Sequence, residues 1–134
     1  MRALVVTVIA LVAAVAAQAA PGPPSPVLVT YEQTGGFAGI ERGLVVYRSG
    51  KMRSEGLAPK VSQLSPARLR ALKGALEQAN FATLARKYRA DVPIADGYLY
   101  RVTYTGRTVL VEQGADPPFR LKRVLSLLSV LAHT

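Results

Sequence analysis

The spacing of apolar residues is the feature that most restricts how this chain can fold. Five segments have the alternating or continuous apolar pattern of a β-strand, and two segments repeat apolar residues every three or four positions, as an amphipathic helix does. Three of the expected strands precede the first helix, and the other two lie between the helices. Because no helix separates the strands in regular alternation, a wound parallel sheet is not indicated. We therefore expect an α+β fold, with a single antiparallel sheet of four to five strands and two main helices packed on one face.

Glycine-containing turns bound most of the expected strands. The first strand starts at Val27, the second is Leu44–Tyr47, and a weaker one spans residues 51–55, where charged side chains suit a sheet edge. Residues 98–104 and 108–112 give the clearest pattern, because a Thr-Gly turn joins two alternating runs. These two runs predict a β-hairpin whose tyrosines form a half-buried stripe on one face.

Helix-start signals mark the first helix and, less directly, the second. Ser65 is a favoured N-cap residue and Pro66 suits the first helical position, while Asp116 is placed to cap the last helix. A short continuation of the first helix is expected to end near Tyr88. The apolar positions of the two helices are Leu69, Leu72, Leu76 and Ala79 in the first, and Leu121, Val124, Leu125, Leu128 and Leu131 in the second, widened by Leu127 and Val130.

The first residues of the chain have the pattern of a secretory signal peptide. A positive start, Met1-Arg2, precedes an apolar run, and Ala17-Gln18-Ala19 offers the small residues that signal peptidase needs. The run is too short for a stable membrane anchor. We expect residues 1–19 to be a signal peptide cleaved after Ala19, residues 20–26 a proline-rich lead, and residues 27–134 the folded domain. The protein is then secreted or periplasmic, with no transmembrane anchor after cleavage.

Cysteine and histidine usage argues against several kinds of active site. The chain has no cysteine, so it forms no disulfide and no thiolate metal site, and an exported protein of this kind fits a bacterial envelope. The one histidine, His133, lies at the end of the given chain, a poor place for a catalytic triad or a zinc ligand. We expect a monomer that is not an enzyme and uses no cofactor and no metal.

Basic residues outnumber acidic ones, with 17 Lys+Arg against 8 Asp+Glu and a formal charge of +9. Those around the first helix are Arg68, Arg70, Lys73, Arg86, Lys87 and Arg89. Two interpretations of this group stay open: a solvated surface, or contacts to an anionic partner such as an envelope polymer, lipid headgroups or an acidic protein. No nucleic-acid-binding motif accompanies the charge, so nucleic acid is not an expected partner.

A glycine-rich segment after the first strand is the main candidate for a binding site. It consists of Thr34, Gly35, Gly36, Phe37, Ala38, Gly39 and Ile40. Three glycines in five residues favour a loop with unusual backbone angles instead of a strand or helix. Two interpretations stay open, because Phe37 either fills the core from a structural crossing or stands exposed at the tip of a presented loop.

Four segments in order resemble the emfourin family, small protein inhibitors of protealysin and related thermolysin-like metallopeptidases. They are the Gly-Gly-Phe-Ala-Gly-Ile segment in residues 34–40, the Leu-Ser-Pro helix start in 64–81, the aromatic hairpin in 96–112 and the Pro-to-Leu helix in 117–131. The resemblance spans about residues 29–131. The signal peptide, the proline-rich lead and an insertion at residues 53–63 depart from it.

The resemblance implies an inhibitor that blocks the active-site cleft of a zinc metallopeptidase through the residue 34–40 loop, and the signal peptide implies that this inhibitor is secreted. The alternative is a non-enzymatic envelope binding or structural module, whose basic helical face binds an anionic surface. Only the inhibitor hypothesis requires Phe37 to be exposed.

Overall fold

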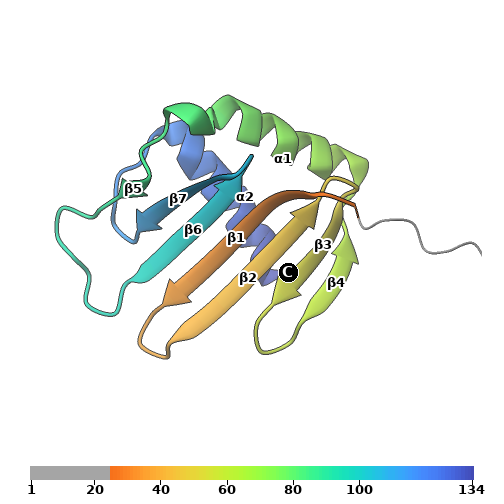
Figure 1. Ribbon diagram of the computed structural model, residues 1–134. Coiled ribbons are helices and arrows are strands. Elements are labelled where there is room, and N and C mark those ends of the chain that lie inside the picture. Colours follow the sequence, from red (N-terminus) through yellow and green to blue (C-terminus); the bar gives the residue numbers. More distant parts are fainter. Residues whose placement is uncertain (1–24) are drawn as a thin grey trace, which may run out of the picture.

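The computed structural model describes residues 25–134, which form one sheet and two main helices (Figure 1). The predicted signal peptide and most of the proline-rich lead lie outside the described residues. The elements in chain order are β1 (Val27–Gly35), β2 (Ile40–Tyr47), β3 (Lys51–Glu55), β4 (Lys60–Gln63), α1 (Pro66–Ala79), the 3₁₀ turn η1 (Phe81–Thr83), β5 (Lys87–Tyr88), β6 (Tyr98–Tyr104), β7 (Arg107–Glu112) and α2 (Phe119–His133).

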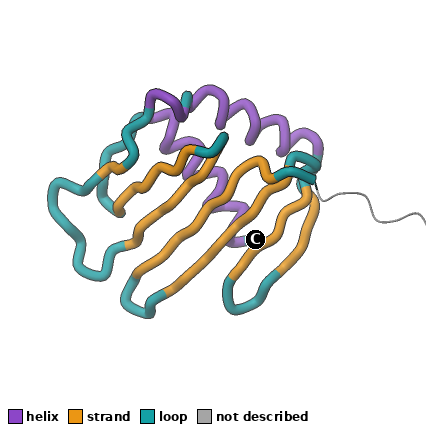
Figure 2. Tube along the Cα trace, viewed as in Figure 1, coloured by secondary structure: helices purple, strands orange, loops and turns teal. Residues whose placement is uncertain are grey.

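The sheet has seven strands in the order β4-β3-β2-β1-β6-β7-β5. All neighbours are antiparallel except β5, which runs parallel to β7, so the sheet is mixed. The expected antiparallel sheet of four to five strands is therefore wrong in strand number and in orientation. The α+β class is confirmed, and both helices lie on the same face of the sheet (Figures 1 and 2).

The two strands absent from the prediction are the two edges of the sheet. β4 offers one apolar residue, Val61, which lies opposite Arg53 of β3, so its sequence lacks an alternating pattern. β5 has only two residues, with Lys87 opposite Leu110 of β7. The predicted helical continuation to Tyr88 is wrong, because only the short turn η1 forms before β5 begins. Edge strands this short are defined by their partners and not by local periodicity.

The helix ends show why one cap prediction succeeds and the other fails. The Ser65 hydroxyl accepts a hydrogen bond from the Arg68 backbone N–H at 3.3 Å, and Pro66 opens α1 as expected. α2 starts later, at Phe119, with no side-chain cap. The prediction that Asp116 caps α2 is therefore wrong, and its carboxylate instead pairs with the ammonium group of Lys122.

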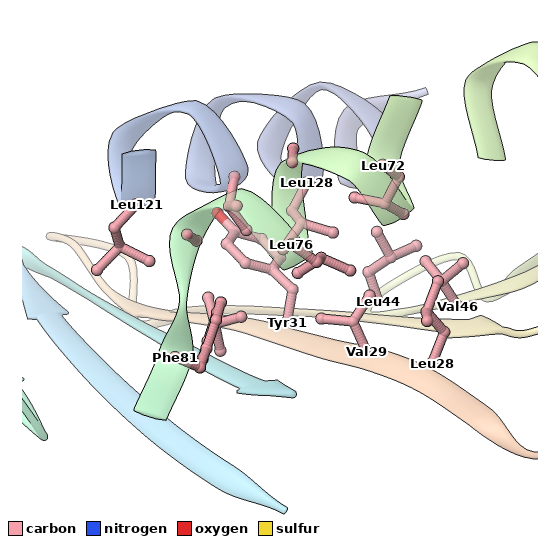
Figure 3. Packing of buried hydrophobic residues seen from close by; sticks show 14 of the residues in the cluster. Leu28, Val29, Tyr31, Leu44, Val46, Leu72, Leu76, Phe81, Leu121 and Leu128 are labelled. Carbon is pink, nitrogen blue, oxygen red and sulfur yellow. The ribbon is translucent and has the colours of Figure 1, made fainter. Parts of the chain in front are cut away.

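The core lies between the sheet and the two helices (Figure 3). Its fully buried large side chains are Val29 and Tyr31 of β1, Leu44 and Val46 of β2, Val102 of β6, Val109 of β7, Leu72 and Leu76 of α1, and Leu121, Val124 and Leu128 of α2. Each buried leucine stabilises the fold by about 1.5–3 kcal/mol relative to exposure. Val130, expected to widen the stripe of α2, is 61% exposed and does not join this core.

The opposite face of the sheet carries polar side chains. Arg101 Nη1 of β6 lies 3.1 Å from Glu32 Oε2 of β1, and the hydroxyls of Thr103 and Thr108 lie 2.8 Å apart. These cross-strand pairs suit a solvated sheet face. The tyrosines of β6 point to the helix side with Val102, where they are half-buried as the sequence predicts.

Candidate functional site

The glycine-rich segment forms the turn of the β1–β2 hairpin. The two strands pair as far as Gly35 opposite Ile40, so only residues 36–39 belong to the turn. Thr34, Gly35 and Ile40 are strand residues, and the expectation that the glycines keep the whole segment out of a strand is wrong. The Gly39 N–H donates to the Gly36 carbonyl at 3.0 Å, which closes the turn.

Two glycines at the base of the turn are required by backbone angle and by space. Gly35 and Gly36 have φ of 104° and 82°, in the region that favours glycine. A Cβ on Gly35 would lie 2.5 Å from the Gly97 carbonyl oxygen, and one on Gly36 would lie 2.8 Å from the ring of Tyr98. The base of the hairpin is therefore packed closely against the start of β6.

Phe37 stands at the tip of this turn with 97% of its surface exposed. The interpretation in which Phe37 fills the core is therefore wrong. Ala38 is also exposed, whereas Ile40 is half-buried in β2. Removing an aromatic ring from water lowers the free energy of the system. A fully exposed Phe on a closed hairpin turn is therefore a candidate contact residue.

Two other loops lie at the same end of the sheet as the β1–β2 turn (Figures 1 and 2). The β3–β4 loop carries Leu57, which is fully exposed, and the loop before β6 carries Val92 at 78% and Ile94 at 49% exposure. We call these three exposed side chains, together with Phe37, the apolar tips. The sequence does not single out Leu57, Val92 and Ile94, because single apolar residues in polar loops carry no periodic signal.

Hydrogen bonds to the last residue of β7 and to the residue after it hold the loop before β6 in place. Glu112 Oε2 accepts from the Ala90 N–H at 3.2 Å, and Gln113 Oε1 accepts from the Tyr98 N–H at 3.0 Å. The hydrogen bond from Ala90, helped by Lys87 and Arg89, holds the pKa of the Glu112 carboxyl below its ordinary value. An ionised Glu112 thus anchors one end of this loop, and Gln113 anchors the other.

The six predicted basic residues belong to different elements of the fold. Lys87 Nζ lies 3.4 Å from Glu112 Oε1 at the β5 edge of the sheet, where Arg89 also acts on Glu112. Arg70 and Lys73 belong to α1, and Arg86 lies before β5, where its carbonyl accepts the Leu110 N–H at 2.8 Å. Lys87 and Arg89 thus act on the Glu112 carboxylate at the β5 edge of the sheet. Arg68, Arg70 and Lys73 belong instead to α1.

Arg68 lines a cleft of about 300 Å³ between α1, α2 and strands β2–β4. Lys60 shares this cleft, and its ammonium donates to the Thr134 carbonyl oxygen at 3.3 Å. The remaining walls are Leu44, Met52, Ser54, Ser62, Gln63, Leu64, Ser65, Leu131 and Thr134. Lys60 and Arg68 thus bring two cationic side chains to a partly apolar cleft.

Residues 25–134 contain no helix that is long and apolar enough to cross a lipid bilayer. In the same part of the chain, no three acidic or histidine side chains gather into a group that could hold a metal ion. No protein-family model matches the chain, and a search of curated proteins finds no match either.

Proposed function

We propose that this protein is a secreted inhibitor of a thermolysin-like zinc metallopeptidase, and that the β1–β2 turn enters the active-site cleft of that enzyme. The observation that carries the proposal is the 97% exposure of Phe37 at the tip of a closed hairpin. The resemblance to the emfourin family supports the choice of target class. Burial of the ring in a partner would supply the anchor that tight interfaces need.

The expected contact follows from what such peptidases bind. They accept a bulky apolar side chain just after the scissile bond, while their zinc polarises the adjacent carbonyl. Phe37 fills that apolar pocket, and the backbone beside it pairs with the edge strand of the enzyme. The Gly39-to-Gly36 hydrogen bond holds the turn closed, so the inserted backbone does not reach the extended geometry that cleavage requires.

The neighbouring loops extend this contact. The β3–β4 loop and the loop before β6 lie on either side of the β1–β2 turn in Figure 1, and they carry the exposed side chains of Leu57 and Val92. Flanking apolar contacts exclude water from a central anchor and raise its contribution to affinity. The net positive charge of the chain favours rapid encounter with an acidic enzyme surface.

An inhibition assay tests the proposal. The protein lacking residues 1–19 is added to a panel of thermolysin-like peptidases, and hydrolysis of a quenched fluorescent peptide is followed. Inhibition should be reversible and competitive, and the inhibitor should remain intact on a mass spectrum. The proposal would be refuted if every enzyme kept full activity at micromolar inhibitor, or if the enzyme cleaved the inhibitor between Gly36 and Gly39.

A second candidate function rests on the cleft that Lys60 and Arg68 line. In this case the protein is an envelope module that binds an anionic surface. Reversal of charge in Lys60→Glu and Arg68→Glu should slow association with anionic vesicles and flatten its salt dependence. An unchanged association rate would leave the basic residues with a solvating role only.

A further inference from the structure

The helix side of the sheet becomes polar toward its β3–β4 edge. Leu44 of β2 and Met52 of β3 are buried on this side, at 2% and 6% exposure. Ser54 pairs with Leu44, and Ser62 of β4 pairs with Met52, so both serines point to the same face as these buried residues. Serine is smaller than the leucines and valines that fill the core between the other strands and the helices. This edge of the sheet therefore leaves unfilled space on its helix side.

This space is the cleft of about 300 Å³ that Lys60 and Arg68 line, and we call it the edge cleft. Part of its lining is apolar, because Leu44, Met52 and Leu64 reach it from the core. The two serines add hydroxyls, and residues of α1 and α2 complete the walls. Apolar and cationic groups from five elements of the fold thus meet around one space.

No acidic side chain of the described residues lines the edge cleft. Lys60 and Arg68 also belong to none of the ion pairs formed within residues 25–134. The Lys60 ammonium donates to the Thr134 carbonyl oxygen at 3.3 Å, which uses one of its three N–H donors. Both cations therefore have donors available to an anionic group in the cleft.

We propose that the edge cleft binds a small amphipathic carboxylate, a molecule that joins one carboxylate to a short apolar chain. The carboxylate accepts charge-assisted hydrogen bonds from Arg68 and Lys60. The apolar chain leaves water against Leu44, Met52 and Leu131, a gain that a fully hydrophilic anion such as phosphate would not obtain. The volume lies at the lower limit of the roughly 300–1,000 Å³ of small-molecule sites, which suits a short chain better than a long-chain fatty acid.

The inference rests on the same cleft as the second candidate function and names a soluble ligand for it. If vesicle binding fails and the small carboxylate binds, the envelope function falls and this site stands; the reverse result removes this site alone. None of residues 36–39 lines the edge cleft, so Phe37→Ala should leave binding of the carboxylate unchanged.

Titration with hexanoate, followed by the amide chemical shifts of the ¹⁵N-labelled protein, tests the proposal. Two matched controls are 1-hexanol, which has the same chain without the charge, and acetate, which has the charge without the chain. Hexanoate should give saturable shifts confined to residues around the edge cleft, and both controls should bind more weakly. Equal binding of either control, saturable shifts elsewhere, or no saturable shift with hexanoate would overturn the proposal.

Three variants locate the carboxylate. Arg68→Gln should weaken hexanoate by about 3- to 10-fold, because it removes one of two charged donors in a partly solvated site. The matched control Arg70→Gln, on an exposed residue of α1 that does not line the cleft, should keep wild-type affinity. Ser62→Leu should block binding, because the larger side chain fills the cleft.

Circular dichroism melts of the same variants separate binding from folding. Arg68 and Arg70 are both exposed, so their variants should keep the wild-type Tm and decide the question even if Ser62→Leu fails to fold. Wild-type hexanoate affinity in Arg68→Gln, or an equal loss in Arg70→Gln, would overturn the assignment.

Discussion

Truncation of Phe37 to alanine should abolish most inhibition without weakening the fold. In the free protein the side chain is 97% exposed, so Phe37→Ala removes almost no buried surface and should shift the Tm by no more than about 1 °C. In the complex the ring would bury about 150–250 Å², worth about 4–6 kcal/mol at 25 cal/mol per Å². The alanine methyl and the remaining backbone contacts retain part of this, which leaves an expected loss of about 2–4 kcal/mol, or about 30- to 1,000-fold in Ki.

Paired measurements of Ki and Tm check this prediction. Each variant is assayed against one sensitive thermolysin-like peptidase and melted by circular dichroism. The control Leu128→Ala removes a fully buried side chain of α2, which should cost about 2–5 kcal/mol of folding free energy and lower the Tm by many degrees. Below its melting transition this control should inhibit like the wild type, because the hairpin turn is intact.

Two results would refute the reasoning. A wild-type Ki for Phe37→Ala would mean that the exposed ring is not the anchor. A large fall in Tm for Phe37→Ala would mean that the ring supports the fold, and any loss of inhibition would then have no bearing on the contact.

Three further predictions follow from single structural features. Gly36→Val should lower both Tm and inhibition, because it forces a branched residue to φ of 82° and against the Tyr98 ring; Gly39→Ala, which meets no atom within 4 Å, should have the smaller effect in the same assays. Glu112 has a lowered pKa in the folded state, so its stabilising effect should be complete above its ordinary pKa and be lost as the pH falls through the folded-state pKa. The variant Glu112→Gln should therefore show a smaller fall in Tm between pH 7 and pH 3 than the wild type. An identical dependence of Tm on pH in the two proteins would contradict this. N-terminal sequencing of the exported protein should read from Ala20, and a mature chain that still begins at Met1 would overturn the expected cleavage.

The residues that could be placed from the sequence are those whose burial repeats locally. Val29 and Tyr31 alternate with Thr30 and Glu32, which predicts a strand. Leu72 and Leu76 recur at helical spacing, which predicts a helix. β4 and β5 do not, because a strand of four or two mostly polar residues exists only through its pairing with β3 or β7. Pairing partners far apart in the chain leave no periodic signal, which is why the strand count and the parallel edge were missed.

The candidate site shows the same limit. An aromatic residue between glycines fits a core plug and an exposed tip equally well, and only the position of the hairpin decides between them. The cleft that Tyr31 and Ser129 line could not be predicted at all, because these two residues come from opposite ends of the domain. Local sequence identifies groups that can bind, whereas the fold decides which of them meet.

The place of β1 in the sheet has a consequence for how the domain assembles. β1 pairs with β2, its neighbour in the chain, and with β6, where Glu32 meets Arg101 across a separation of 69 residues. Strands β1–β4 and the β6–β7 hairpin are each built from short-range pairings, so each can form early, whereas the β1–β6 pairing must first close a long loop. Because Tyr31 belongs to β1 and Tyr100 to β6, the stacked contact between their rings forms only after this long loop has closed.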